Sequence, residues 1–215
     1  RYFLHQGNSI NLHWAEEGIV KSTGKRYIME TCQCFEFNDK GALVKLTWYN
    51  DTFAMYNAFL NNTDPGLSIV QHREDYFITG DGPIDALPAA LDLYKMLGEG
   101  NLPGIISKMS NDLVVVFAGP AEITPYAGIY YGPLGMTQFL YALVTNYQSL
   151  MLNLNIFTTD GFKVDVQWEE KMIATPTGKI VGLQGMHSLF FNSQGQLIKF
   201  RSYNNTYNVA WSFTN

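Results

Sequence analysis

The sequence predicts an α+β fold, on three observations. Residues 84–151 carry segments with the apolar spacing of helices, and four strand-like runs separated by turn residues follow them. Helices followed by an antiparallel meander are typical of α+β domains. The chain is 47% hydrophobic and only 15% charged, against about 25% charged in an average soluble domain, which indicates a large buried core. The third observation is an internal repeat of the strand region.

The helices are predicted from apolar residues on one face and from the residues that end them. In residues 84–97 the apolar positions Ile84, Leu87, Leu91 and Tyr94 share a helical face, which ends at Gly98 and Gly100. A second short helix is expected over residues 102–109 and a third over 136–151. Between them, residues 113–118 are predicted to form a strand that ends at a Gly-Pro turn.

Four strands are predicted after the third helix, at residues 152–159, 162–174, 179–192 and 196–206. The turn-forming residues Gly161, 175–178 and 192–195 separate them. The strands are therefore expected to form an antiparallel meander.

The repeat appears when the chain is shifted by 154 positions. Residues 3–59 then lie over 157–213 without a gap, with 17 identities in 57 positions, among them Trp14 on Trp168 and Glu16 on Glu170. A match of this length predicts a duplicated domain, because the repeats of solenoid proteins are shorter.

The duplication predicts three regions of unequal completeness. Residues 1–59 correspond to the C-terminal strand half of a first copy, 60–83 to a linker rich in turn formers, and 84–215 to a complete second copy. Nothing in the chain corresponds to residues 84–156 for the first copy, and position 1 is Arg. We therefore expect a processed or partial product, completed by an upstream segment, a cleaved piece or another chain, or a homo-oligomer. In the linker, Asn61 stands in a glycosylation sequon and is the expected glycosylation site if the protein is secreted.

The charge balance and the cysteines exclude several classes of function. The formal charge is −5 without a cluster of Lys and Arg, which argues against a nucleic-acid partner, and no apolar stretch approaches the roughly 20 residues of a membrane helix. Cys32 and Cys34, at i and i+2 of a predicted strand, lie about 6.5–7 Å apart at Cα, which is too far for an unstrained disulfide. We expect free, packed thiols, no metal site and no cofactor, because no further Cys or His follows at a ligand spacing. The sequence indicates no compartment.

Two motifs resemble a known family. Residues 119–132, Gly-Pro-Ala-Glu-Ile-Thr-Pro-Tyr-Ala-Gly-Ile-Tyr-Tyr-Gly, look like the G-P-x-x-x-x-P-Y-A-G-x-Y-x-G hairpin of SnoaL-like (polyketide-cyclase-like) proteins, within the ketosteroid-isomerase and nuclear-transport-factor superfamily. Residues 195–206 are similar to that family's G-x-I-V-x-F-R-x-Y-x-D-T ending, and residues 48–52 fit it in part. The resemblance covers residues 84–213 in full and 3–59 in part.

The resemblance implies a cone: three helices packed against a strongly curved antiparallel sheet, with a pocket between them. Members often pair through the sheet, so two copies in one chain are expected to form a pseudo-dimer. The family contains isomerases, polyketide cyclases and epoxide hydrolases together with many members that bind ligands without catalysis. Fold membership alone therefore does not assign the function.

His187 and Glu170 are the candidate catalytic residues. His187 alternates with Gly185, Leu189 and Phe191, so it shares the apolar face of a strand, and SnoaL-like chains often carry His there. It is either a base or a buried histidine that is hydrogen-bonded to a Tyr or a backbone carbonyl. Glu170 follows Trp168 on an otherwise apolar strand face. It is either a pocket acid–base group or the partner of a cation such as Arg201 or Lys199.

The candidate ligand-binding residues are Tyr126 and Tyr130 on the hairpin, with Trp168 and Asn205. Either tyrosine could orient a ligand oxygen or simply pack. Asn205 stands where the family ending has Asp, and the first copy keeps Asp51 there but has Gln33 in place of His187. Neither copy therefore contains an intact acid–base pair.

Two functional hypotheses follow from these residues. The first is a tandem SnoaL-like protein that binds a small apolar ligand or acts as an assembly subunit without catalysis. The alternative is a metal-free isomerase or cyclase that moves a proton on a carbonyl-bearing polycyclic substrate, with His187 as base and Tyr126 or Glu170 assisting.

Overall fold

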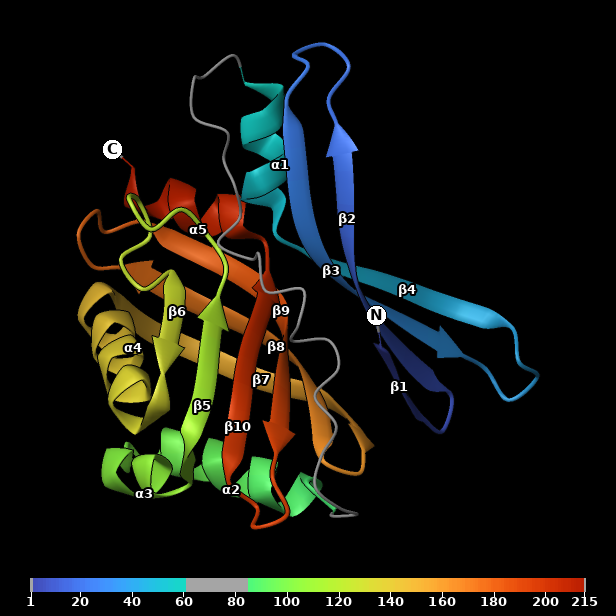
Figure 1. The fold of residues 1–215 in the computed structure, drawn as a ribbon, viewed down its shortest axis with the longest axis vertical. Coiled ribbons are helices and arrows are strands. Elements are labelled where there is room, and N and C mark those ends of the chain that lie inside the picture. Colours follow the sequence, from blue (N-terminus) through green and yellow to red (C-terminus); the bar gives the residue numbers. More distant parts are fainter. Residues whose placement is uncertain (1, 61–84, 215) are drawn as a thin grey trace.

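The computed structural model describes residues 2–60 and 85–214, which form two sheets and five helices (Figure 1). The predicted α+β class is confirmed. The linker residues 61–84, including Asn61, lie outside the described residues. The first stretch contains four strands and one helix: β1 (Tyr2–Gln6), β2 (Ser9–Ile19), β3 (Arg26–Phe37), β4 (Leu43–Asn50) and α1 (Thr52–Phe59).

The second stretch contains the helices and a six-stranded sheet. Its elements are α2 (Leu87–Gly98), α3 (Leu102–Ser107), β5 (Met109–Phe117), β6 (Gly128–Tyr131), α4 (Gly132–Asn146), β7 (Tyr147–Asp160), β8 (Lys163–Ala174), β9 (Ile180–Phe191), β10 (Leu197–Asn204) and α5 (Thr206–Phe213). The sheet order is β6-β5-β10-β9-β8-β7, and every neighbouring pair is antiparallel except β5 and β10. Strands β7 to β10 form the predicted antiparallel meander.

The helices α2, α3 and α4 cover the concave face of this sheet (Figure 1). Their buried side chains, such as Leu93, Ile105 and Phe139, pack in one cluster with Val164, Val166 and Leu189 of the strands. Asp165 and Gln167 of β8, which alternate with these, point to the opposite face and are buried as well. Both faces of the sheet are therefore covered.

Two predicted elements differ from the structure, and two short helices were not predicted. The third helix spans 132–146 instead of 136–151, because Tyr147 already pairs with Ala174 in the ladder between β7 and β8. Cross-strand pairing here overrides the helical spacing of the sequence. The strand predicted at residues 113–118 is β5, which is longer and begins at Met109. The short helices α1 and α5 were not predicted, so the larger unit carries four helices rather than three.

The four-stranded sheet, in the order β1-β2-β3-β4, packs on the outer face of the six-stranded sheet. Cys32, Cys34 and Tyr49 from the smaller sheet cluster with Met186 and Tyr203 from the larger one. Both cysteines are free and buried, as predicted. At one end of this interface α1 lies beside α5 (Figure 1), with the rings of Tyr56 and Tyr207 4.4 Å apart.

Elements of the two stretches recur at a spacing of 154 residues. The bounds of β3, β4 and α1 become those of β9, β10 and α5 when 154 is added. Turn glycines with positive φ recur in the same way: Gly24 and Gly178 both have φ 71°, and Gly41 and Gly195 have 74° and 72°. This left-handed backbone favours glycine, so the two stretches turn by the same backbone geometry.

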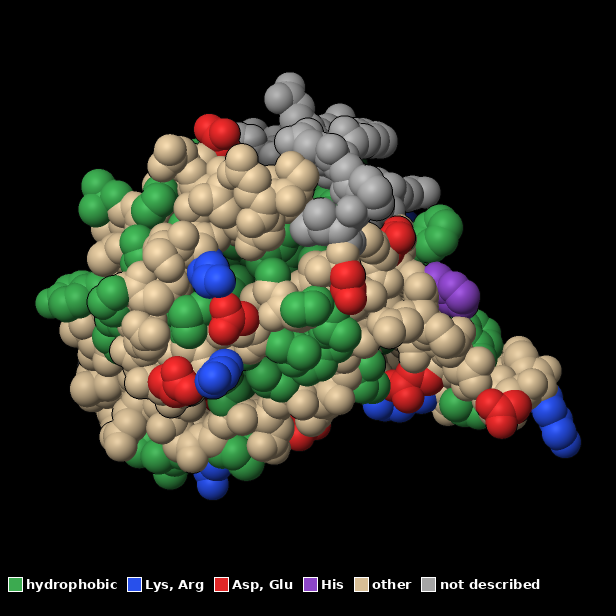
Figure 2. All heavy atoms as spheres, turned by 90° about the horizontal axis from the view of Figure 1, so that it is seen from below, with side chains coloured by type: hydrophobic (Ala, Val, Ile, Leu, Met, Phe, Trp, Pro, Cys, Tyr) green, Lys and Arg blue, Asp and Glu red, His purple; other side chains and the backbone are tan. Residues whose placement is uncertain are grey.

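The surface carries few charges. Figure 2 views the end of the molecule formed by α2 and α3, where hydrophobic side chains gather between scattered residues of both signs. Leu91, Leu97 and Leu102 are exposed on these helices. Among the described helices, none has the length and apolar character needed to cross a bilayer.

Candidate functional site: an apolar cavity beneath the helices

A cavity of about 570 Å³ lies between the helices α2–α4 and the concave face of the six-stranded sheet. Most of its wall is apolar, and it is large enough for a small organic molecule. The apolar part is contributed by both layers, for example by Leu93, Met136, Phe139, Leu152 and Phe200. His187 and Glu170 both line this cavity, together with Trp168, Tyr126, Tyr94 and Asn204.

His187 extends from β9, where it alternates with Gly185 and Leu189 as the strand period requires. Its Nδ1 lies 2.8 Å from the Tyr94 hydroxyl, and the rings of Trp168 and Phe200 lie with centroids 4.9 Å away. Burial in this apolar setting lowers the pKa of His187 to about 3. The imidazole is therefore neutral at pH 7.

Tyr94 is the partner that sequence reasoning did not assign, although it stood on the predicted helical face. Burial raises the pKa of its hydroxyl above the ordinary value for tyrosine, so the proton stays on oxygen. If the hydroxyl donates to Nδ1, the Nε2–H of His187 is left as a hydrogen-bond donor. His187 is therefore a partly buried histidine that is hydrogen-bonded to a tyrosine.

Glu170 extends from β8 into the same cavity. Burial raises the pKa of its carboxyl above the usual range, and a hydrogen bond with Ser149 opposes that shift. The ion pair considered from the sequence does not form with Arg201, which pairs with Glu30 on the other side of the sheet. Strand alternation explains this, because Phe200 faces the cavity and Arg201 therefore faces away.

Two further polar groups at the cavity have no hydrogen-bond partner among the described residues. They are the indole N–H of Trp168 and the side-chain oxygen of Asn204, and both residues are almost fully buried. Asn204 was missed in the sequence, although it alternates with Ser202 and Phe200 along β10 and period-two counting would have found it. A buried donor and a buried acceptor are available to a ligand.

Of the four predicted ligand-binding residues, two line the cavity and two do not. Trp168 and Tyr126 are buried in its wall. Tyr130 lies behind Tyr126, to whose carbonyl oxygen its hydroxyl donates a 3.0 Å hydrogen bond. Asn205 caps α5 by accepting a hydrogen bond from the Asn208 amide, and it lies at the interface of the two stretches, where it accepts another from the Thr52 hydroxyl.

No family model matches the chain, and no curated protein matches it. Solved structures do share the fold. An NTF2-like protein from Burkholderia xenovorans superposes with a TM-score of 0.54 at 15% identity, covering 63% of this chain and 100% of that protein. One from Burkholderia thailandensis gives 0.54 at 15% identity, with 60% and 98% covered. One of unknown function from Burkholderia pseudomallei gives 0.51 at 19% identity, with 60% and 98% covered.

At these identities the similarity establishes the fold alone. The chain contains an NTF2-like α+β fold. The matched share of the chain corresponds in length to the unit from α2 to α5. A cavity between helices and a curved sheet is a feature of this unit, and its chemistry depends on the side chains described above.

Proposed function

We propose that the cavity binds a small, mostly apolar molecule that carries at least one oxygen function. The observation behind the proposal is the wall itself: about 570 Å³ of mainly apolar lining with a few polar groups, Glu170, His187, Trp168 and Asn204. Such a wall gives affinity through apolar contact and orientation through a few hydrogen bonds. The unpartnered indole N–H and amide oxygen favour a ligand with both an acceptor and a donor.

Binding without catalysis is the first function that we propose for this site. A base needs a pKa close to the working pH, and His187 has a pKa of about 3. As a neutral imidazole held by Tyr94, it fits a role in orienting a ligand oxygen.

The binding test uses a hydrophobic fluorescent dye as probe, with a cavity-filling variant and a matched control on the same helix. Leu143 lines the cavity, whereas Tyr141 is exposed two residues earlier in α4. Leu143→Trp is expected to abolish saturable dye binding and Tyr141→Trp to preserve it. Equal binding by both variants would show that the dye binds elsewhere and would remove support for the cavity.

Proton transfer is the second candidate function, and the placement of Glu170 in the same cavity as His187 favours it. In this case the Glu170 carboxylate removes a proton next to a substrate carbonyl, and the electron pair moves onto the carbonyl oxygen. His187 Nε2–H or the Trp168 N–H stabilises that oxygen, and Glu170 returns the proton to another carbon. A raised carboxyl pKa suits such a base.

Proton exchange distinguishes the two functions. A ligand with a carbonyl group is incubated in D₂O with the protein, and deuterium incorporation next to the carbonyl is followed by NMR. Catalysis predicts incorporation that Glu170→Gln abolishes while dye binding persists. Incorporation at the same rate in Glu170→Gln would exclude Glu170 as the base.

We further propose that the chain is a tandem of SnoaL-like copies, organised as residues 1–59, 60–83 and 84–215. The matching element bounds and turn glycines support this proposal, and so do recurring hydrogen bonds. The hydroxyls of Thr23 and Thr177 each donate to the carbonyl 35 residues later, and so do the ammonium groups of Lys25 and Lys179. The face-to-face sheets then correspond to a dimer formed within one chain.

A partner or an upstream segment that completes the first copy is part of the same proposal. In the larger unit, helices cover the face of β10, whereas Leu43, Leu46 and Trp48 on the corresponding strand β4 are 49%, 43% and 58% exposed. Native mass spectrometry of the natural protein tests this point. Additional mass of about half a domain, or a second polypeptide, is expected, and a stable monomer of the 215 residues would contradict it.

A further inference from the structure

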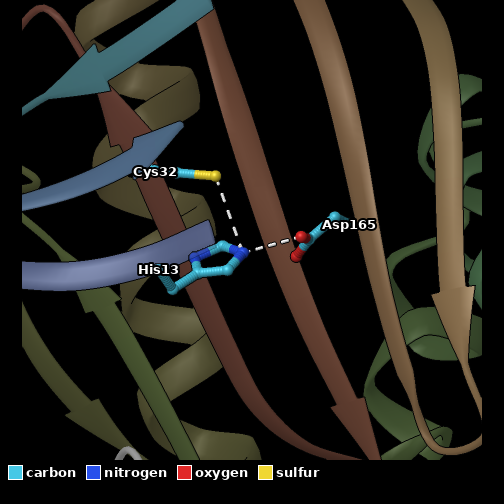
Figure 3. A group of neighbouring side chains, drawn as sticks. All are labelled: His13, Cys32 and Asp165. Carbon is cyan, nitrogen blue, oxygen red and sulfur yellow. Dashed lines mark hydrogen bonds and ion pairs between the residues drawn. The ribbon is translucent and has the colours of Figure 1, made fainter. Parts of the chain in front are cut away.

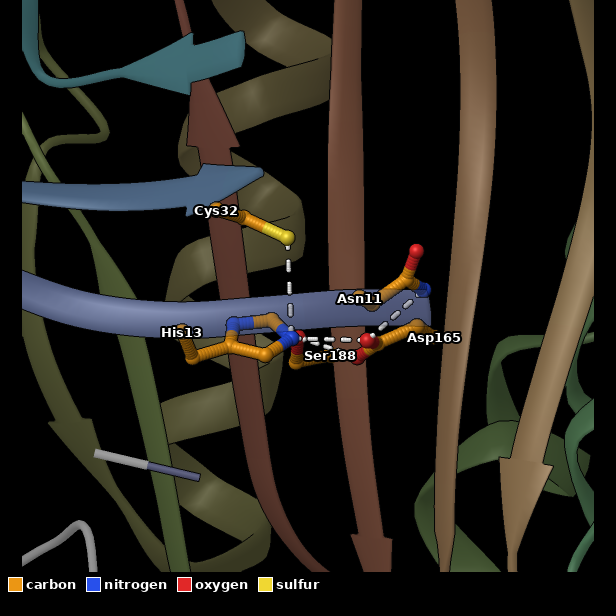
Figure 4. Close-up of polar contacts among 5 residues, drawn as sticks. All are labelled: Asn11, His13, Cys32, Asp165 and Ser188. Carbon is orange, nitrogen blue, oxygen red and sulfur yellow. Dashed lines mark hydrogen bonds and ion pairs between the residues drawn. The ribbon is translucent and has the colours of Figure 1, made fainter. Parts of the chain in front are cut away.

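A second group of chemically active side chains lies outside the cavity, between the two sheets. We call Asn11, His13, Cys32, Asp165 and Ser188 the interface cluster (Figures 3 and 4). His13 and Cys32 are directly opposite each other on β2 and β3, and Asp165 and Ser188 are directly opposite on β8 and β9. Packing of the two sheets brings these two cross-strand pairs together.

Three potential ligand atoms converge in this cluster. His13 Nε2 lies 2.7 Å from Asp165 Oδ2 and 3.6 Å from Cys32 Sγ, and all three atoms lie within 4.8 Å of one another. Figure 3 shows the sulfur and the carboxylate on the same edge of the imidazole. Nε2 carries either one proton or one lone pair, so it cannot serve both neighbours fully at the same time. A single cation between the three atoms serves all of them.

The surroundings orient these ligand atoms. Ser188 Oγ donates a 2.6 Å hydrogen bond to Asp165 Oδ1, and Asn11 Nδ2 donates a 3.0 Å hydrogen bond to Asp165 Oδ2. The side-chain oxygen of Asn11 is buried and has no hydrogen-bond partner among the described residues. Turning this amide by 180° places its oxygen beside Asp165 Oδ2, where it supplies a fourth ligand (Figure 4).

We propose that the interface cluster binds one divalent transition-metal ion of the Zn²⁺ class, held by His13, Cys32, Asp165 and the amide oxygen of Asn11. Tetrahedral zinc, with Zn–N of about 2.0–2.1 Å and Zn–S of about 2.3 Å, separates these two ligands by about 3.5 Å, and the observed separation is 3.6 Å. The nitrogen and the carboxylate oxygen must move apart by about 0.6 Å to reach tetrahedral spacing.

The charges suit a buried metal. His13, Cys32 and Asp165 are 0%, 0% and 1% exposed. A dication with one thiolate, one carboxylate and a neutral imidazole has no net charge, which a dry interior requires. Binding releases the thiol proton to solvent, so metal affinity rises with pH. Because the site is closed, we expect loading during folding, and the ion then joins the two sheets.

The residues found 154 positions after His13 and Cys32 support a metal-binding role for these two side chains. There, Gln167 stands for His13 and Met186 for Cys32, and both are buried at the same interface. Residues that do not bind zinc readily therefore pack at the corresponding places. Packing alone does not require a histidine and a cysteine on the other side.

The first experiment measures metal in the whole chain. The protein is unfolded in urea with a chelator, refolded with Zn²⁺ or with the chelator, and freed of unbound metal. One equivalent of zinc and a higher melting temperature are expected after refolding with Zn²⁺. Refolding with Co²⁺ is expected to give the near-ultraviolet absorption of a thiolate–cobalt bond. Absence of both retained zinc and this absorption would overturn the proposal.

The second experiment uses His13→Gln and Cys32→Met, which introduce the residues found 154 positions later. Both variants are expected to lose the zinc and the zinc-dependent rise in melting temperature. Cys34→Ser is the matched control, because Cys34 is buried on the same strand and Ser188 occupies its corresponding position. It is expected to keep the metal. Zinc retained in Cys32→Met, or lost equally in Cys34→Ser, would leave the cluster as a hydrogen-bonded network without a metal.

Discussion

Asp51 and Asn205, which are 154 residues apart, face each other in an antiparallel bridge at the junction of the two stretches. Their neighbours repeat the relationship in both directions. Thr52 donates to Asn205 Oδ1 and Thr206 donates to Asp51 Oδ1, while the amides of Phe53 and Tyr207 donate to the hydroxyls of Thr206 and Thr52. Isologous interfaces have reciprocal contacts of this kind, so these hydrogen bonds support the proposed pairing of two copies within the chain.

This relationship predicts that position 51 tolerates asparagine, the residue found at the facing position 205. Asp51→Asn keeps an oxygen that accepts from the Thr206 hydroxyl, so we expect it to change the free energy of unfolding by less than about 1 kcal/mol. Asp51→Ala leaves the buried hydroxyl without this acceptor and is expected to cost about 1–3 kcal/mol. Urea unfolding of both variants measures the difference. Equal losses would show that the carboxylate charge, rather than the acceptor, is required.

The buried ion pair between Glu30 and Arg201 gives a second prediction. Both side chains are nearly inaccessible, and they join β3 to β10 across the interface. Arg201→Met removes the arginine charge from a buried carboxylate and is expected to cost about 3–5 kcal/mol of unfolding free energy. The double variant Glu30→Gln, Arg201→Thr introduces the residues found at Gln184 and Thr47, and it should be more stable than Arg201→Met alone.

A double-mutant cycle over these two positions provides the control. The coupling energy is expected to exceed about 1 kcal/mol, as for residues that share a buried network. Additive losses would mean that the two charges are stabilised by other groups.

The low pKa of His187 predicts a pH-dependent stability. The pKa is about 3 in the folded protein, whereas an unfolded histidine titrates near 6.5, so the unfolded state takes up the proton first. Stability is complete above about pH 6.5 and decreases as the pH falls towards 3, at about 1.4 kcal/mol for each unit of pKa difference. Urea unfolding between pH 4 and 7 should show a shallower decrease in His187→Gln. An unchanged slope would place this titration elsewhere.

Gly185 is required by close packing rather than by a turn. A Cβ at this position would lie 2.3 Å from the Trp168 ring and 2.5 Å from the Tyr203 carbonyl oxygen. Gly185→Ala must displace one of them and is expected to cost about 1–3 kcal/mol of unfolding free energy. Gly182→Ala on the same strand meets nothing within 4 Å and serves as the control. Similar effects of both substitutions would indicate that strand propensity, rather than this contact, determines the loss.

The sequence predicted the recurring strands and part of the cavity because both depend on local spacing, whereas it did not predict the short helices α1 and α5. Strand alternation placed Glu170 and Trp168 on the apolar face of one strand and His187 on that of another, and all three line one cavity in the structure. The same reasoning extended a helix through residues 147–151, because the apolar spacing there does not reveal pairing with β8.

The interface cluster could not be predicted from residue spacing, for a different reason. His13 and Asp165 are 152 residues apart and meet only because two sheets pack face to face. The spacing of Cys and His along the chain indicated no metal site, whereas the side chains that neighbour Cys32 in the cluster come from β2 and β8. Pairing between sheets depends on the whole fold, so no local pattern predicts it.

The charge of Glu170 is expected to lower the stability of the folded protein at neutral pH. Burial raises its pKa, so the folded state holds the proton more tightly than the unfolded state does. Stability is therefore lost as the pH rises through the unfolded value and then through the raised one. Glu170→Gln removes this penalty and is expected to stabilise the protein at pH 7 by about 0.5–2 kcal/mol.

The control for this substitution is Glu169→Gln, because the neighbouring carboxylate points to the other side of β8, where it accepts a hydrogen bond from the exposed Gln184. It should change stability by no more than about 0.5 kcal/mol. Unfolding of both variants at pH 4 and pH 7 completes the test, since the gain from Glu170→Gln should shrink at pH 4, where the carboxyl is protonated. A gain that is the same at both pH values would mean that the charge of Glu170 is not the cause. A carboxylate kept in an apolar wall against such a penalty supports the proposed role of Glu170 at this cavity.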